Sequence, residues 1–150
     1  MEFETTVTDI IQRTHNVKSF RFLKPQTFIH KAGQFMFVTL KSGGEKLRKH
    51  FTISSSPTED FIEFTKKLSD SIFSQTLQTS RIGDSAVING PHGRFTFEGE
   101  YGRIAMLSGG IGITPLRSML KYIMDEGITT NVVLLYANRS EKDIVFREEL

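Results

Sequence analysis

Hydrophobic and polar positions alternate with a period of two in several short segments of the first 97 residues. Phe20 and Phe22 alternate with Ser19 and Arg21, and the same pattern recurs at residues 35–38, 51–54, 62–66 and 95–97. This period places successive side chains on opposite faces of a β-strand. Clusters of turn-forming residues separate the segments, at 24–25, 42–44, 57–60, 83–84 and 90–93. The pattern predicts short strands in an antiparallel barrel or sandwich.

One short helix is expected to interrupt these strands. Ser71 is a suitable N-cap, because its hydroxyl can accept a hydrogen bond from a free amide of the first turn. Ile72, Phe73 and Leu77 then supply an apolar stripe, with the last two residues four positions apart. The expected helix has a length of about two turns, judged from the helical repeat.

The pattern changes at residues 98–102, where we place a domain boundary. An uninterrupted apolar run at 104–107 predicts a fully buried parallel strand. A glycine-rich turn follows, with Thr114 as the expected N-cap and Pro115 as the first helical residue. Gly127 is expected to end that helix.

A second apolar run at 132–135 predicts a second buried strand. Residues 140–143 read Ser-Glu-Lys-Asp, which resembles a capping box that opens another helix. The strand, helix and strand predict a parallel α/β unit with a right-handed crossover. We therefore expect a barrel at residues 1–99 and a separate α/β unit at residues 100–150.

Composition narrows the classes of partner. The chain is 38% hydrophobic and 24% charged, which is ordinary for a globular protein. A net charge of +2 lacks the concentrated positive charge of a phosphate-backbone binder, so we expect no nucleic-acid partner. Without Cys, these residues hold no thiolate-bound cluster or zinc, and the four His lack metal-ligand spacing. No apolar run is long enough for a membrane span and no signal peptide is evident, so we expect a cytoplasmic protein.

A basic, aromatic and hydroxyl-bearing segment is the first candidate for chemistry. It reads Arg48-Lys49-His50-Phe51-Thr52-Ile53-Ser54-Ser55. Binding of a flavin needs cations for its phosphates, a flat apolar side chain for its ring and hydrogen-bond donors along the ring edge. An ordinary amphipathic strand is the alternative interpretation of these residues alone.

This segment resembles the Arg-x-Tyr-Ser signature of the ferredoxin-NADP reductase family, in a Phe-Thr variant. The resemblance implies that Phe51 lies against the isoalloxazine, that Thr52 hydrogen-bonds near flavin N5, and that a basic residue holds the phosphates. On a regular strand Lys49 shares the face of Phe51, whereas Arg48 shares the face of Thr52. The sequence leaves both cations as candidates for the phosphate.

The next segment also follows the family pattern, in which a strand passes the flavin and a short helix directs its N-terminus at the phosphate. The corresponding residues are Phe64, Thr65, Lys66 and Lys67, followed by Ser71, Ile72, Phe73 and Ser74. Free amides and the helix dipole favour an anion at such a terminus. Plain helix capping is the alternative.

The segment Gly90-Pro91-His92-Gly93-Arg94-Phe95 matches the turn before the final barrel strand of the family, and a structural role is favoured for it.

The glycine-rich turn gives the sharpest signal, because it follows an apolar strand and opens a helix. Gly110 and Gly112 would let the backbone approach a pyrophosphate, and Thr114 could donate to a nicotinamide-bearing ligand. The segment Gly110-Ile111-Gly112-Ile113-Thr114-Pro115 matches the form found in the reductase family. Asn138, Arg139 and Ser140 resemble the family segment that contacts the adenosine ribose or its 2′-phosphate. Arg139 would pair with such a phosphate or lie exposed.

The resemblance implies a six-stranded antiparallel flavin-binding barrel at residues 1–99. It also implies that residues 100–150 are the N-terminal part of an incomplete, Rossmann-like NAD(P)-binding domain. The flavin cofactor would be FAD, with FMN as the alternative, and NAD(P)H would be the electron donor. We expect an oxidoreductase that passes a hydride from NAD(P)H to the flavin and electrons to an acceptor protein or small molecule. Phe51 and Thr52 are its expected catalytic residues. The alternatives are an electron-transfer subunit that needs a partner for NAD(P)H oxidation, and a flavin-free docking barrel. A complete family member would continue past Leu150, so we expect a truncated chain or one completed by another subunit.

Overall fold

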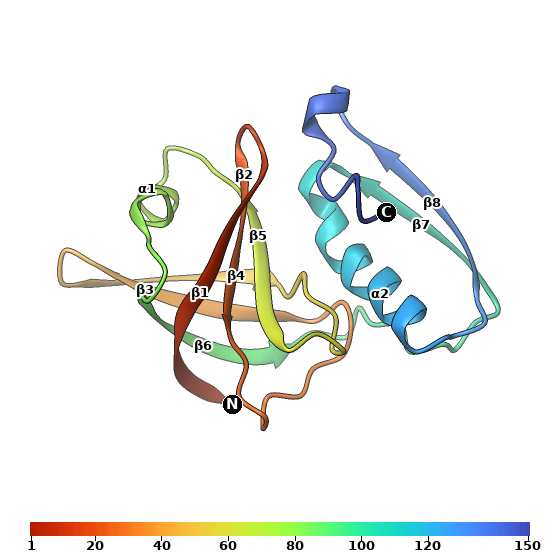
Figure 1. The fold of residues 1–150 in the computed structure, drawn as a ribbon, viewed down its shortest axis with the longest axis horizontal. Helices are drawn as coiled ribbons and strands as arrows, with labels where there is room; N and C mark the ends of the chain where they lie inside the picture. Colours follow the sequence, from red (N-terminus) through yellow and green to blue (C-terminus); the bar gives the residue numbers. More distant parts are fainter.

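The computed structural model describes residues 1–150 as two lobes (Figure 1). Six strands build the first lobe as one antiparallel sheet in the order β4-β3-β6-β1-β2-β5. Their bounds are β1 (Glu2–Thr14), β2 (Val17–Leu23), β3 (Phe35–Ser42), β4 (Glu45–Thr52), β5 (Phe61–Lys67) and β6 (Ser85–His92). The sheet curls until its two ends meet, where the amide of Ser54 donates to the carbonyl oxygen of Glu63 at 2.8 Å. The predicted six-stranded antiparallel barrel is confirmed.

Phenylalanine rings fill the barrel. The register of β2 and β5 pairs Phe20 with Phe64. Phe64 stacks on Phe20 and Phe22, with ring centroids 5.3 and 5.7 Å apart. Each such buried ring contributes about 1.5–3 kcal/mol through removal of apolar surface from water. On β3 the residues that face the core are Met36 and Val38. Phe35 and Phe37 alternate with them and therefore lie on the outer face.

The strand predicted at residues 95–97 does not form. The last barrel strand is β6, which already contains Gly90 and Pro91, so the Gly-Pro turn lies at the end of this strand and not before another one. The chain then passes close to Gly33, where an added Cβ would lie 2.2 Å from the carbonyl oxygen of Phe95. Phe97 is buried in the apolar core of the second lobe. The segment therefore connects the lobes.

The short helix predicted to interrupt the barrel strands is α1 (Ile72–Thr79), which lies between β5 and β6, and its N-cap is Ser71 as expected. The amide of Ser74 donates to the Ser71 hydroxyl at 3.3 Å. Phe73 and Leu77 are buried in the barrel core.

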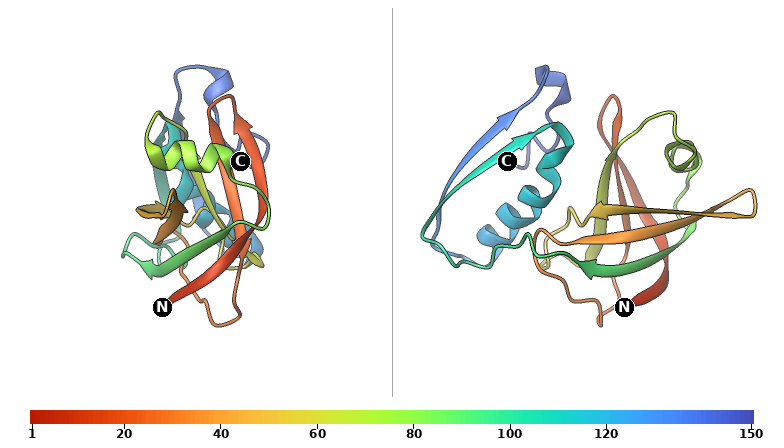
Figure 2. Two further views of the ribbon diagram at one scale, coloured as in Figure 1. Left: turned by 90° about the vertical axis from the view of Figure 1, so that its left-hand side faces the viewer. Right: turned by 180° about the vertical axis from the view of Figure 1, so that it is seen from behind.

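The second lobe contains parallel strands β7 (Arg103–Gly109) and β8 (Asn131–Ala137), joined through η1 (Gly110–Gly112) and α2 (Ile113–Asp125). Figure 2 shows α2 between this sheet and the barrel. The prediction of fully buried strands is wrong, because Leu107, Val133 and Leu135 are 74%, 60% and 58% exposed. A helix covers one face of the sheet only, so side chains alternate between a covered and an open face.

The expected helix start is also corrected. The N-cap of α2 is Gly112. Thr114 lies inside the first turn, and its hydroxyl donates to the carbonyl oxygen of Ile111 at 3.2 Å. Pro115 fits there because amides of the first turn need no intrahelical partner. Gly127 follows the helix with φ of 63°, as its predicted terminating role requires.

The predicted capping box at residues 140–143 forms only η2 (Glu141–Asp143), a single 3₁₀ turn. The hydroxyl of Ser140 donates to Asp143 Oδ2 at 2.8 Å and caps no backbone amide. No α-helix follows η2. None of the helices is both long and apolar enough to cross a bilayer.

Candidate active site

A cleft of about 650 Å³ lies between the two lobes. One wall contains Phe51 and Thr52 from the end of β4 and Thr65 from β5. The opposite wall is the glycine-rich turn and the first turn of α2, with residues Ile111, Gly112, Thr114 and Pro115. Folding therefore brings the predicted flavin-side and nucleotide-side residues to one cleft.

Packing against the barrel holds Phe51 in place. Its ring stacks on Phe64 with centroids 4.5 Å apart and an interplanar angle of 15°, and it contacts Phe73 of α1 at 5.4 Å. Phe51 is only half-buried and lines the cleft, so part of it remains available to a ligand. Fixed aromatic side chains of this kind suit the stacking of a flat ring.

Strand β4 places Arg48 and Lys49, the two candidates for binding the flavin phosphate, on opposite faces. Lys49 lies on the same face of β4 as Phe51, and the guanidinium of Arg48 lies 4.5 Å from the ring of Phe37 on the outer face. On the Phe51 face, Lys66 Nζ is 5.9 Å from the ring centroid of Phe51. Burial lowers the pKa of Lys66, and repulsion from nearby Lys49 lowers it further. Two like charges held together without a neighbouring carboxylate favour an anion beside them.

The start of α1 adds polar hydrogens to this region. Phe73 belongs to its first turn and touches Phe51. The hydroxyls of Ser69, Ser71 and Ser74 are hydrogen-bonded to one another at 3.1 Å. The first turn contains no acidic side chain. This end of the helix can therefore receive a negatively charged group.

Ser54 and Ser55 turn away from the cleft, although the sequence predicts both as cofactor ligands. Both are fully buried. The hydroxyl of Ser54 donates to Glu63 Oε1 at 2.8 Å, and the hydroxyl of Ser55 accepts from the Glu63 amide at 3.0 Å. Their role in this structure is to hold the end of β4 against β5. Ile53 is likewise buried in the barrel core.

A hydroxyl network lies behind the cleft wall. The hydroxyl of Thr65 is hydrogen-bonded to those of Ser19 and Ser54, at 2.7 and 3.0 Å. Ser54 in turn donates to the fully buried carboxylate of Glu63, which also accepts from Arg13 at 3.1 Å. The network restricts the orientation of Thr65, so the polar wall of the cleft is preorganised.

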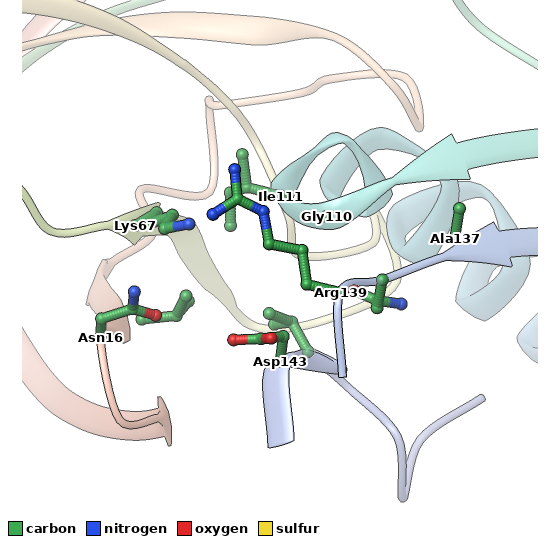
Figure 3. A pocket seen from close by; sticks show the side chains of 10 residues that line it. Asn16, Lys67, Gly110, Ile111, Ala137, Arg139 and Asp143 are labelled. Atoms are coloured by element: carbon green, nitrogen blue, oxygen red, sulfur yellow. The ribbon is translucent and has the colours of Figure 1, made fainter. Parts of the chain in front are cut away.

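A second pocket, of about 330 Å³, lies beside the glycine-rich turn (Figure 3). Lys67 from the barrel and Arg139 from the second lobe extend into the same space, and Asp143 also lines the pocket. The amide atoms of Asn138 are buried there without a hydrogen-bond partner, so a polar ligand could satisfy them. The pocket is suited to a nucleotide that carries phosphate.

The remaining predicted site residues are not all at these pockets. His50 lines the main cleft from the outer face of β4. Ile72 is exposed, Ile113 is buried in the core of the second lobe, and Ser140 lies at η2.

Sequence reasoning missed several pocket residues. Phe35 and Phe37 line the main cleft, and Asn16 and Val17 at the β1–β2 turn line the second pocket. Alternation along β3 shows that Phe35 and Phe37 share a face, but it does not identify that face as the outer one. No local signal distinguishes Asn16 from any other turn residue.

Two family models match the chain in succession. The model of the oxidoreductase FAD-binding domain matches residues 4–97, and that of the oxidoreductase NAD-binding domain matches residues 106–150. The glycine betaine monooxygenase reductase subunit of Chromohalobacter salexigens is 35% identical over 147 residues, which cover 94% of this chain and 40% of that protein. Ferredoxin-NADP reductase B of Sorangium cellulosum is 30% identical over 135 residues, covering 88% of this chain and 55% of the relative. The chain thus spans about half or less of the length of these relatives.

Solved structures share the fold. A ferredoxin NADP⁺ reductase from Neisseria gonorrhoeae with bound FAD and NADP has a TM-score of 0.87 at 21% identity, covering 99% of this chain and 62% of that one. The cytochrome b5 reductase domain of Ulva prolifera nitrate reductase has a TM-score of 0.82 at 26% identity, covering 99% and 66%. Together with the domain matches, they show that the chain belongs to the ferredoxin-NADP reductase-like family of oxidoreductases, in which a FAD-binding domain precedes an NAD-binding domain.

Proposed function

We propose that residues 1–99 bind FAD, that residues 100–150 begin the NAD(P)-binding domain, and that the whole protein is an NAD(P)H-dependent oxidoreductase. The observation that carries this proposal is the shared cleft. Phe51 and Thr52 form one wall, and Gly112 and Thr114 form the other. A hydride can move between two bound molecules only when they meet face to face at close range.

The residues of the barrel fit FAD. Phe51 offers a supported aromatic surface, and Thr52 offers a hydroxyl at its side. Lys49 and Lys66 repel each other, so a pyrophosphate near them would relieve an unfavourable contact. The free amides at the start of α1 would add donors to the same group. We assign the pyrophosphate to Lys49 rather than Arg48, because Lys49 shares the face of Phe51.

Bound FAD would supply the redox chemistry, accepting a hydride from the nicotinamide and passing electrons on to an acceptor. The chain itself contributes position and electrostatics. Phe51 orients a flat ring, and the hydroxyl of Thr52 can hydrogen-bond at its edge. Gly112 leaves room for a ligand because it has no side chain.

We assign the second pocket to the phosphate-bearing part of the nicotinamide dinucleotide. Lys67 and Arg139 approach it from different lobes, and Gly110 and Ile111 also line it. Arg139 is the candidate partner for a 2′-phosphate, since its guanidinium can bind phosphate in a bidentate manner. The cytoplasmic location expected from the sequence remains a prediction.

Spectroscopy of the purified protein tests the proposal. Native mass spectrometry and a visible spectrum should report one FAD per chain and absorbance near 450 nm. Addition of NADH or NADPH without oxygen should bleach that band. A protein that takes up no flavin when FAD is added would refute the flavin assignment. A bound flavin that neither nucleotide reduces would instead indicate a subunit that needs a partner.

The Thr52→Ala variant tests the assignment of that hydroxyl. We expect it to slow flavin reduction more than it weakens flavin binding, because the lost hydrogen bond is directed at the reacting edge. Stopped-flow reduction gives the rate, and titration of the apoprotein with FAD gives the affinity. An unchanged reduction rate would contradict the role of Thr52.

A further inference from the structure

A buried arginine joins the two lobes beside the cleft. Arg117 lies on α2 and its side chain is only 6% exposed. Its guanidinium donates to both carboxylate oxygens of Glu59, to Glu149 Oε2 at 2.7 Å, and to the carbonyl oxygen of Ser54 at 3.2 Å. Nε adds a further bond to Glu149 at 2.9 Å. Each nitrogen of the planar fork therefore has a partner, which a flexible lysine cannot reproduce.

The neighbouring residue makes a second contact of the same kind. The hydroxyl of Ser118 donates to the carbonyl oxygen of Ser55 at 2.7 Å, and both residues are fully buried. Two successive residues of α2 thus bind two successive carbonyl groups of the barrel. A paired contact of this kind resists rotation of the helix as well as translation.

This joint lies close to both cleft walls along the chain. Ser54 is two residues after Thr52, and Arg117 is three residues, nearly one helical turn, after Thr114. Since short rigid segments connect the joint to each wall, the separation of Thr52 from Thr114 depends on the bonds of Arg117 and Ser118.

The charges around Arg117 are balanced across the lobes. Glu59 belongs to the barrel, and Glu149 also accepts from Arg13 of β1 at 2.7 Å. Burial alone would lower the pKa of Arg117, but its bonds to Glu59 and then Glu149 raise it, so the guanidinium stays charged. Burial likewise opposes ionisation of Glu149, and Arg117 overcomes this and lowers its pKa.

We propose that Arg117, with Ser118, forms an interlobe joint that sets the width of the cleft, which makes Arg117 a positioning residue for hydride transfer. This role rests on the function proposed above. Arg117 does not line the main cleft, so its effect passes through the separation of the walls. A misplacement of about 1 Å between reacting groups can lower a rate by about 100-fold.

The test compares Arg117→Lys and Ser118→Ala with a matched control, Lys121→Met. Lys121 is on the same helix, four residues on, and its ammonium group pairs with Asp125 of that helix and not with the barrel. The hydrogen bond from Thr58 of the barrel to Asp125 does not involve Lys121. We expect all three proteins to retain flavin. The limiting rate of flavin reduction at saturating NAD(P)H should fall by about 10- to 100-fold in Arg117→Lys, with the half-saturating concentration within about twofold of wild type. Lys121→Met should match wild type.

Hydrogen exchange without nucleotide provides an independent measurement. Arg117→Lys and Ser118→Ala should accelerate exchange at residues 53–59 and leave residues 61–64 unchanged. An unaltered limiting rate in Arg117→Lys, or unaltered exchange at 53–59 in both variants, would overturn the proposal. If wild-type flavin is reduced by neither nucleotide, the proposed NAD(P)H oxidation by this protein alone fails, but the joint is still tested. Accelerated exchange at residues 53–59 in both variants then supports the joint, and unaltered exchange overturns it.

Discussion

Removal of the carboxylate of Glu63 should destabilise the barrel strongly. Glu63 is completely buried, and it accepts hydrogen bonds from Arg13 at 3.1 Å, Arg21 at 2.9 Å and Ser54 at 2.8 Å. In Glu63→Ala the two guanidinium groups lose this partner and remain partly buried, and Ser54 loses its acceptor. Removal of one member of a buried ion pair typically costs about 3–5 kcal/mol. Glu63→Gln should cost less, because its oxygen still accepts from Ser54.

Urea denaturation followed by circular dichroism measures this loss. With a slope of about 2 kcal/mol per molar urea, the midpoint of Glu63→Ala should fall by about 1.5–2.5 M while the slope stays constant. The melting temperature should fall by about 6–20 °C, at roughly 2–4 °C for each kcal/mol in a chain of this size. Glu141→Gln, which breaks an exposed pair with Arg147, is the control and should change stability by less than about 1 kcal/mol. A loss below about 1 kcal/mol in Glu63→Ala would refute the argument from buried charge.

Three further outcomes are expected. Gly112→Ala should leave the fold intact, because the nearest atom to an added Cβ is Ser108 Oγ at 3.6 Å. It should weaken NAD(P)H binding in titrations, because Gly112 lines the cleft. An unchanged affinity would refute the close approach of the dinucleotide to the Gly112 backbone. Burial lowers the pKa of His30 from 6.5 to about 4. As the pH decreases, the imidazole is therefore protonated in the unfolded chain before it is protonated in the folded chain. The free energy of unfolding should fall by about 3 kcal/mol between pH 6.5 and pH 4. His30→Phe should flatten that part of the pH profile in urea titrations, and an unchanged profile would contradict the burial argument. Arg139→Ala should raise the KM for NADPH more than that for NADH, and equal effects would exclude pairing with a 2′-phosphate.

Several features follow from the sequence because neighbouring residues specify them. The period of two predicts the barrel strands, and it places Lys49 with Phe51 and apart from Arg48. Ser71 caps α1 by accepting a hydrogen bond from the amide of Ser74, three positions further along the chain. Such contacts depend on local backbone geometry, which the order of residues largely determines.

Local rules also mislead where distant segments compete. Residues 95–97 alternate like a strand, but they connect the lobes and bury Phe97 against the second core. Residues 104–107 resemble a fully buried strand, although α2 covers only one of their faces. Whether an apolar residue is buried depends on what packs over it, and that information is absent from its own segment.

The amino-acid order thus determined the barrel, the short capped helix and the chemical character of the two cleft walls. Only the tertiary structure decided that Lys66 lies beside Lys49, that Asn16 reaches the second pocket, and that Arg117 meets Glu59. These groups are far apart along the chain, and their meeting depends on curling of the sheet and docking of α2. The pattern of side chains specifies which face of each helix or strand must be buried. Which other surface covers that face is decided by the packing of the whole chain.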